Sequence, residues 1–204
     1  MLYNSIITNN KAVGKNVLGG AIENYNVYMS IIGTNFTYNN ATATNSQAIG
    51  GAIYHNNGTI SITTSRFHSN TVKANNSYAG AIYFTGSKFT LNQTQFNRNI
   101  ANGQSAGGAG ALFIGANSTI TKTNFTSNQA LGKSNGGGAI INTGNLTANN
   151  NNFISNIANA TGSAISNSGK VIDANSNYWG SSSPNWTKLI HGFNKPSKYL
   201  SKAI

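Results

Sequence analysis

The residues that could perform acid–base, metal or nucleophilic chemistry are few and scattered. The 204-residue chain has two carboxylates, Glu23 and Asp173, and no cysteine. Paired-carboxylate hydrolysis and calcium binding both need clustered carboxylates, and these two lie on different repeats, far apart in the chain. The three histidines, His55, His68 and His191, occupy different parts of the repeat and form no metal-binding set. We therefore predict no enzyme, no metal and no cofactor, and a polysaccharide lyase or hydrolase is the disfavoured alternative.

Positive charge is the second chemical feature. Thirteen lysines and arginines against two acids give a formal net charge of +11. Such unopposed charge favours anionic partners, for example acidic glycans or wall polymers. We select Arg66, Arg98, Lys73 and Lys133 as candidate contacts, and a merely solvated basic surface is the alternative interpretation. Nucleic acid is not an expected partner, because the basic residues are spread thinly and follow no recognised motif.

A repeat positions these residues. A Gly-Ala-Ile motif recurs at steps of 31, 29, 30, 28 and 25 residues, counted between its third positions. Its copies are Gly20-Ala21-Ile22, Gly51-Ala52-Ile53, Gly80-Ala81-Ile82, Gly110-Ala111-Leu112, Gly138-Ala139-Ile140 and the weaker Ser163-Ala164-Ile165. Phe-x-x-Asn follows five of them, at Phe36/Asn39, Phe67/Asn70, Phe96/Asn99, Phe125/Asn128 and Phe153/Asn156. Two motifs that keep one phase along the chain indicate one repeating structural unit.

The repeat has strand periodicity. Apolar residues lie seven and five positions before most of the phenylalanines, as Ile60 and Ile62 do before Phe67, and a spacing of two is typical of strands. Gly- and Asn-rich turns leave about three short strands per repeat and no segment for a crossover helix. Repeats of this length bury their apolar faces by stacking. The sequence therefore predicts an all-β fold, a parallel β-helix of about six coils in which the motif asparagines bond from coil to coil.

Repeat length varies almost entirely between Phe-x-x-Asn and the next Gly-Ala-Ile. The variable segments include residues 73–78, 102–108 and 132–137. We expect them to be loops on one side of the rod, where solenoids often bind partners.

The two ends of the chain differ. Ser183 as N-cap, Pro184 at the first helical position and Gly192 beyond the end predict a short helix that caps the last coil. We assign residues 1–180 to the β-helix, with an incomplete first coil, and 181–204 to the capping segment. The incomplete start leads us to expect a piece of a longer protein. No apolar run approaches the roughly 20 residues of a membrane span, so direct membrane insertion is not expected.

The motifs resemble those of two groups of surface proteins. Gly-Gly-Ala-Ile alternating with Phe-x-x-Asn is similar to the repeats of chlamydial polymorphic outer-membrane proteins. The ending Asn177-Tyr178-Trp179-Gly180, followed by Ser183-Pro184-Asn185-Trp186, resembles adhesin-like surface proteins of methanogenic archaea. The resemblance implies a right-handed β-helix of the pectin-lyase type on an extracellular cell-surface protein that takes part in adhesion. Ten Asn-x-Ser/Thr sequons are compatible with an exported glycoprotein.

Aromatic residues supply a second candidate surface. Tyr54, Tyr83 and Phe113 each follow the last residue of the Gly-Ala-Ile motif, and Phe84 comes one position later. If the motif isoleucines point inward, alternation directs the first three outward, one above another, where they could stack on sugar rings. The alternative is that they pack under the variable segments. We therefore predict a non-catalytic module that binds glycans or wall polymers, and a passive spacer within a larger surface protein is the alternative function.

Overall fold

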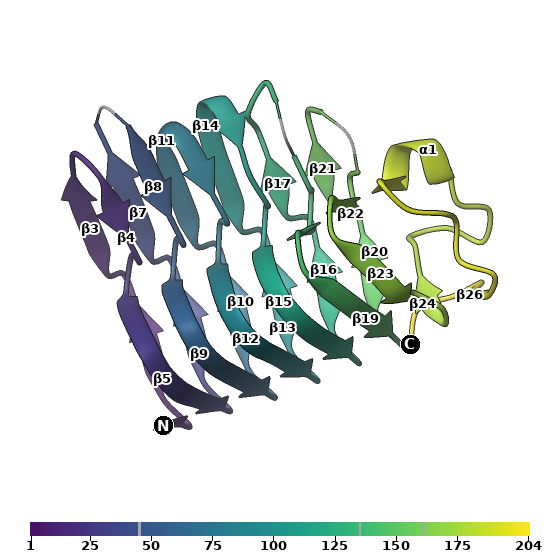
Figure 1. Ribbon diagram of the computed structural model, residues 1–204, viewed down its shortest axis with the longest axis horizontal. Coiled ribbons are helices and arrows are strands. Elements are labelled where there is room, and N and C mark those ends of the chain that lie inside the picture. The colour runs from purple at the N-terminus through teal and green to yellow at the C-terminus, as the bar shows by residue number, and fades with distance from the viewer. Residues whose placement is uncertain (45, 135, 161) are drawn as a thin grey trace.

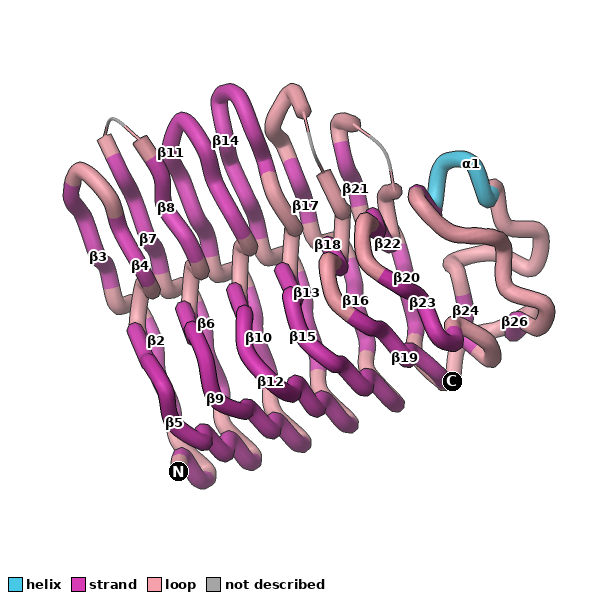
Figure 2. The backbone as a smooth tube through the Cα atoms, viewed as in Figure 1, coloured by secondary structure: helices cyan, strands magenta, loops and turns pink. Residues whose placement is uncertain are grey.

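The protein is a solenoid made almost entirely of strands (Figures 1 and 2). The computed structural model describes residues 1–44, 46–134, 136–160 and 162–204. The chain winds through about six turns, and the strand pairs between successive turns are parallel. Successive turns add strands to three sheets, which run along the rod from the N-terminal to the C-terminal end. The predicted all-β solenoid is confirmed.

The three sheets contain the following strands. The first sheet has β1 (Leu2–Tyr3), β5 (Ile22–Ile32), β9 (Ile53–Thr63), β12 (Ile82–Asn92), β15 (Leu112–Thr121), β18 (Ile140–Asn142), β19 (Asn145–Asn149), β22 (Ile165–Asn167), β23 (Lys170–Asp173) and β25 (Ile190–His191). The second has β2 (Ile6–Thr8), β6 (Asn35–Thr37), β10 (Arg66–His68), β13 (Gln95–Asn97), β16 (Asn124–Thr126), β20 (Asn152–Ile154), β24 (Asn177–Tyr178) and β26 (Tyr199–Leu200). The third has β3 (Lys11–Gly14), β4 (Val17–Leu18), β7 (Asn40–Ala43), β8 (Gln47–Ile49), β11 (Thr71–Tyr78), β14 (Ile100–Gly107), β17 (Gln129–Ala130) and β21 (Ile157–Ala158).

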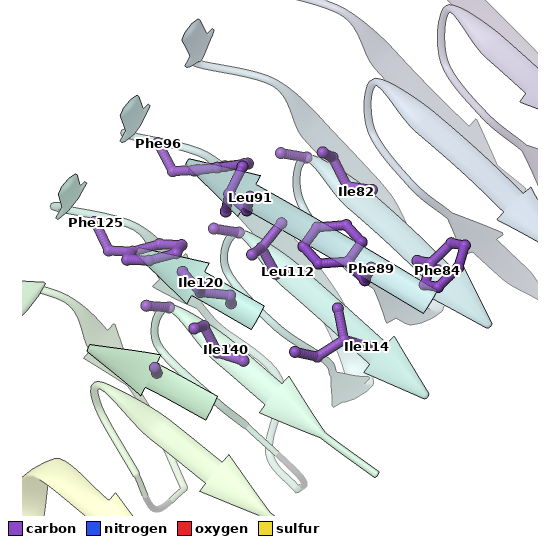
Figure 3. Packing of buried hydrophobic residues seen from close by; sticks show 14 of the residues in the cluster. Ile82, Phe84, Phe89, Leu91, Phe96, Leu112, Ile114, Ile120, Phe125 and Ile140 are labelled. Atoms are coloured by element: carbon purple, nitrogen blue, oxygen red, sulfur yellow. The ribbon is translucent and has the colours of Figure 1, made fainter. Parts of the chain in front are cut away.

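The core consists of columns of like side chains. The motif phenylalanines stack face to face, with ring centroids 4.7 Å apart for Phe36 and Phe67 and 4.8 Å apart for Phe67 and Phe96. The column ends on Trp179, 4.9 Å from Phe153. Figure 3 shows Phe96 and Phe125 of this column beside isoleucine and leucine side chains of the first sheet. In a parallel solenoid, equivalent positions of successive turns lie one strand spacing apart, about 4.8 Å. The same residue type at an equivalent position of each turn therefore produces a stacked column.

The motif asparagines form a buried polar column at the turn after the second sheet. The Asn70 side-chain amide donates to Asn99 Oδ1 and to the Phe36 carbonyl, both at 3.0 Å, and Asn99 repeats the pattern one turn on. The predicted coil-to-coil bonding is confirmed. A second column, which the sequence analysis did not identify, joins Thr34, Ser65 and their equivalents: the Thr34 N–H donates to Ser65 Oγ at 3.1 Å.

The expectation of loops in the variable segments is wrong for two of them. Residues 73–78 lie within β11, and residues 102–107 lie within β14. The two strands pair with each other through Lys73 and Asn102, then, after a bulge, through Asn76 and Ala106. The extra residues of these two segments lengthen β11 and β14 together. The backbone groups of the two strands can therefore pair with each other instead of with water. The segment 132–137 includes a residue outside the described part of the chain.

The cap differs from the prediction in its bounds. The helix α1 covers only Trp186–Leu189, and its N-cap is Asn185 and not Ser183, since the Asn185 side chain accepts from the Lys188 N–H. The helix ends before Gly192 because Ile190 pairs with Ile165 and returns the chain to the first sheet. Trp186 packs edge-on against Trp179, at 5.7 Å, and covers the end of the phenylalanine column. In the described residues no helix is long and apolar enough to cross a membrane.

Candidate functional site

The outward-facing position after each motif isoleucine forms a column on the first sheet, which we call the outer column. Its members pair in register from turn to turn: Glu23, Tyr54, Tyr83, Phe113, Ile141, Ser166 and His191. Unlike the phenylalanine column of the second sheet, it changes residue type at almost every turn.

The middle of the outer column is an aromatic stack. The Tyr54 and Tyr83 rings lie 5.5 Å apart at an interplanar angle of 10°, and Tyr83 and Phe113 lie 4.6 Å apart at 15°. All three side chains are partly exposed, so the predicted outward direction is confirmed. However, stacked rings cover each other's faces. Since Tyr25 packs edge-on against Tyr54, with centroids 5.6 Å apart, the ring edges and the Phe113 end of the stack remain for a ligand.

Tyr78, at the end of β11, packs beside this stack. Its ring centroid is 6.4 Å from those of both Tyr83 and Phe113, at angles of 77° and 89°. The alternative that the aromatics pack against a variable segment is therefore correct in part. Burial raises the pKa of Tyr83, and Tyr54 and Tyr78 add to the effect, so the Tyr83 hydroxyl remains a neutral donor at ordinary pH.

Beyond Phe113 the outer column opens into a groove. Side chains shrink from Phe113 to Ile141 and then to Ser166, and the strands of the third sheet beside them shorten from β14 to β17 and β21. The result is a hollow of about 320 Å³, which we call the column groove. It is lined by Tyr78, Ala106, Gly108, Phe113, Ile141, Thr143, Ser166, Asn167, Ser168 and His191. Since one face of Phe113 rests on Tyr83, its other face is directed along the column, toward Ile141 and the groove.

Four of the remaining candidate residues lie away from this surface. Arg66 is on the second sheet, Arg98 follows β13, Lys73 is on the third sheet, and Lys133 follows β17. All four side chains are exposed. The structure therefore does not bring the basic and aromatic candidates together.

Phe84 is a wrong assignment. Its side chain has no exposed area and belongs to the core (Figure 3). Alternation explains the error: Phe84 is one position after the outward Tyr83, so it points inward, as does His55, its partner in the previous turn.

In the described residues no three of His, Cys, Asp and Glu gather as possible metal ligands. Asn24 Nδ2 lies 2.9 Å from His55 Nδ1, and the buried Nε2 of His55 has no hydrogen-bond partner. Burial lowers the pKa of His55. The pKa of His68 is lowered by burial and by the nearby charges of Arg66 and Arg98.

Sequence reasoning missed Tyr78 and His191 as parts of the surface. A signal for His191 existed: the step of 25 residues from Ile140 to Ile165, taken once more, reaches Ile190, which makes His191 the next outward position. No comparable signal existed for Tyr78, because its place depends on the pairing of β11 with β14.

Other hollows, of about 400 to 470 Å³, lie at the cap, beside Ile204 and over Gly115 and Gly144 on the first sheet. One, of about 400 Å³, includes Asp173, but the two oxygens of this carboxylate already accept from Asn149 and Asn175. Comparison of the chain with protein-family models, with curated proteins and with solved structures finds no match in any of the three.

Proposed function

We propose that this protein is a non-catalytic module of an extracellular surface protein and that it binds a glycan along the outer column, with one sugar ring in the column groove. The observation that carries the proposal is the end of the aromatic stack: Phe113, its last ring, lines a groove that also contains short hydroxyl side chains. Sugar recognition in proteins combines an aromatic face for the C–H surface of the ring with polar groups at its edge.

The composition of the groove supports a sugar over a purely apolar ligand. Phe113, Ile141 and Tyr78 provide apolar surface, and Thr143, Ser166 and Ser168 provide hydroxyls that can donate or accept. No lysine, arginine or carboxylate lines it. The basic candidates Arg66, Arg98, Lys73 and Lys133 therefore play no part in this binding mode.

Titration calorimetry with a panel of neutral, amine-bearing and acidic oligosaccharides tests the proposal. We expect one class to bind the unaltered protein and Phe113→Ala to weaken that binding at least tenfold, because the variant removes the stacking surface. Tyr28→Ala is the matched control, since Tyr28 is 66% exposed on β5, away from the groove. Its binding should equal that of the unaltered protein.

Two results would overturn the proposal. Binding that survives Phe113→Ala but is lost in Arg66→Gln/Arg98→Gln would move the site to the second sheet. If no oligosaccharide binds, the passive spacer is the remaining function. The continuous phenylalanine column favours that function, because stacked rings stiffen the rod along its length.

A further inference from the structure

Among the residues of the outer column, Glu23 at the far end of the aromatic stack is the one acid. Glu23 pairs in register with Tyr54, the first ring of the stack. Tyr25, two residues on, donates its hydroxyl to Glu23 Oε1 at 2.7 Å. The Tyr25 ring also packs edge-on against Tyr54, with centroids 5.6 Å apart at 63°. One carboxylate is thus held beside two aromatic rings on the surface proposed to bind glycan.

This carboxylate is not neutralised by the protein's own cations. In the described residues no lysine or arginine nitrogen lies within 4.0 Å of Glu23, although the chain has thirteen such side chains and only two acids. Glu23 is exposed, and its second oxygen, Oε2, has no hydrogen-bond partner in the described part of the chain. An ionised carboxylate accepts about four hydrogen bonds, so Glu23 retains most of its capacity for a ligand.

Tyr25 acts as a fixed donor to this group. Its hydrogen bond to Glu23 is the main cause that raises the pKa of Tyr25 to about 12, with burial and the negative charge of Glu23 adding to it. The phenol therefore stays protonated at any physiological pH and orients the carboxylate.

We propose that Glu23, Tyr25 and Tyr54 form a subsite for a protonated amine, so that the glycan bound along the outer column is an oligomer of an amino sugar and not a uronic acid polymer. This inference rests on the proposed function. A carboxylate provides the counter-charge and hydrogen bonds for an ammonium group, and the flanking rings add cation–π attraction. The same carboxylate repels the acid groups of a uronic acid polymer.

The spacing of the outer column sets the size of the ligand. Glu23 and Phe113 are separated by three register steps, through Tyr54 and Tyr83, which is about 14 Å at the usual distance between strands. A single sugar cannot contact both the groove and the carboxylate. The ligand must be a chain of several sugars that lies parallel to the solenoid axis.

The test compares two oligosaccharides of equal length, a glucosamine hexamer with free amines and its fully N-acetylated form. At physiological salt and pH 6, where the amines are largely protonated, we expect the free-amine hexamer to bind at least fivefold more tightly. Glu23→Gln should abolish this preference, because the amide carries no counter-charge for the ammonium groups. Tyr25→Phe should reduce the preference without abolishing it, because the carboxylate remains but loses its orienting donor.

Asp173→Asn is the control, since it makes the same change in net charge at the other carboxylate, with folding of each variant checked by its melting temperature. Equal binding of both hexamers, or a preference that survives Glu23→Gln, would overturn the amine subsite while leaving glycan binding intact. Failure of both hexamers to bind, while a uronic acid oligomer binds through Phe113, would also overturn the subsite alone. Absence of binding to every oligosaccharide would overturn the proposed function with it.

Discussion

Two columns of side chains on this solenoid have the same register from turn to turn but differ in composition: one repeats the same residue type, and the other does not. The core column of the second sheet has a phenylalanine in five successive turns, Phe36 to Phe153, and then Trp179. The outer column of the first sheet has an equal register from turn to turn but passes from Glu23 through aromatic residues to Ser166 and His191.

The difference separates what holds the fold from what the surface can do. The phenylalanine column repeats because each ring must fill the same space between the same neighbours. An outward column has no such constraint, so its variation along the axis produces chemically distinct places: a carboxylate at one end, a stack in the middle and a groove where the side chains become small. The repeating phenylalanine column belongs to the scaffold, and the outer column, which does not repeat, carries the candidate site.

The largest effect expected from this comparison is on stability. Phe96→Ala removes a ring that is fully buried between Phe67 and Phe125, and should lower the free energy of unfolding by about 3–5 kcal/mol. Phe113→Ala, on the partly exposed outer column, should lower the free energy of unfolding by only about 1–2 kcal/mol, because the Phe113 ring buries less apolar area on folding than the Phe96 ring does. Urea denaturation measures both. Equal losses would contradict the distinction between the two columns.

A second prediction applies the comparison to asparagine. Asn99→Ala deletes the amide that donates to Asn128 and to the Phe67 carbonyl and that accepts from Asn70. Each buried polar group left without a hydrogen-bond partner costs about 1–3 kcal/mol. We therefore expect the free energy of unfolding, measured by urea denaturation, to fall by at least that amount. The control is Asn97→Ala, two residues earlier on the outer side of β13, which should change stability by about 0.5 kcal/mol or less. A control that is as damaging as Asn99→Ala would refute a special role for the asparagine column.

Sequence reasoning could predict the scaffold because its signals are periodic. Gly-Ala-Ile and Phe-x-x-Asn fix one phase per turn, and phase determines both the strand and the direction of each side chain. Alternation alone sufficed to orient Tyr54, Tyr83 and Phe113 outward. Applied one residue further, it would also have excluded Phe84.

The groove could not be predicted in the same way, because it depends on pairing between segments of unequal length. Tyr78 reaches the outer column only because β11 extends to residue 78 and continues to pair with β14 after a bulge. Likewise, the end of the helix at Leu189 follows from the pairing of Ile190 with Ile165, which overrides the local signals of Ser183 and Gly192.

The third prediction concerns a place where the core itself departs from repetition, at His55. Its pKa is lowered below the ordinary value of 6.5 by burial, so the unfolded chain binds the proton more readily than the folded protein does. Stability conferred by the neutral ring is therefore full above about pH 6.5 and is lost as the pH falls toward the lowered pKa. His68 contributes with the same sign.

We expect the melting temperature of the unaltered protein to fall between pH 7 and pH 5, and His55→Leu to reduce this fall. His68→Asn serves as the comparison, with a smaller reduction, since His68 is less buried. A pH dependence that is identical with and without His55 would show that the buried ring is tolerated in its charged form.

The last prediction makes the outer column more uniform by placing a phenylalanine where the column has a small side chain. We expect this change to have the smallest effect on stability and the largest effect on glycan binding. Ser166→Phe places a ring in the floor of the column groove, two turns beyond Phe113. The position is partly exposed, so the variant should fold with a melting temperature close to that of the unaltered protein. The added ring fills the hollow that the shrinking side chains leave, and we expect at least a tenfold loss of glycan affinity in titration calorimetry.

The control is Thr119→Phe, which adds the same ring at an exposed position of β15 outside the groove and should bind glycan normally. If both variants bind alike, the variation along the outer column does not create the binding site, and the glycan must contact the aromatic edges of Tyr54 and Tyr83 instead.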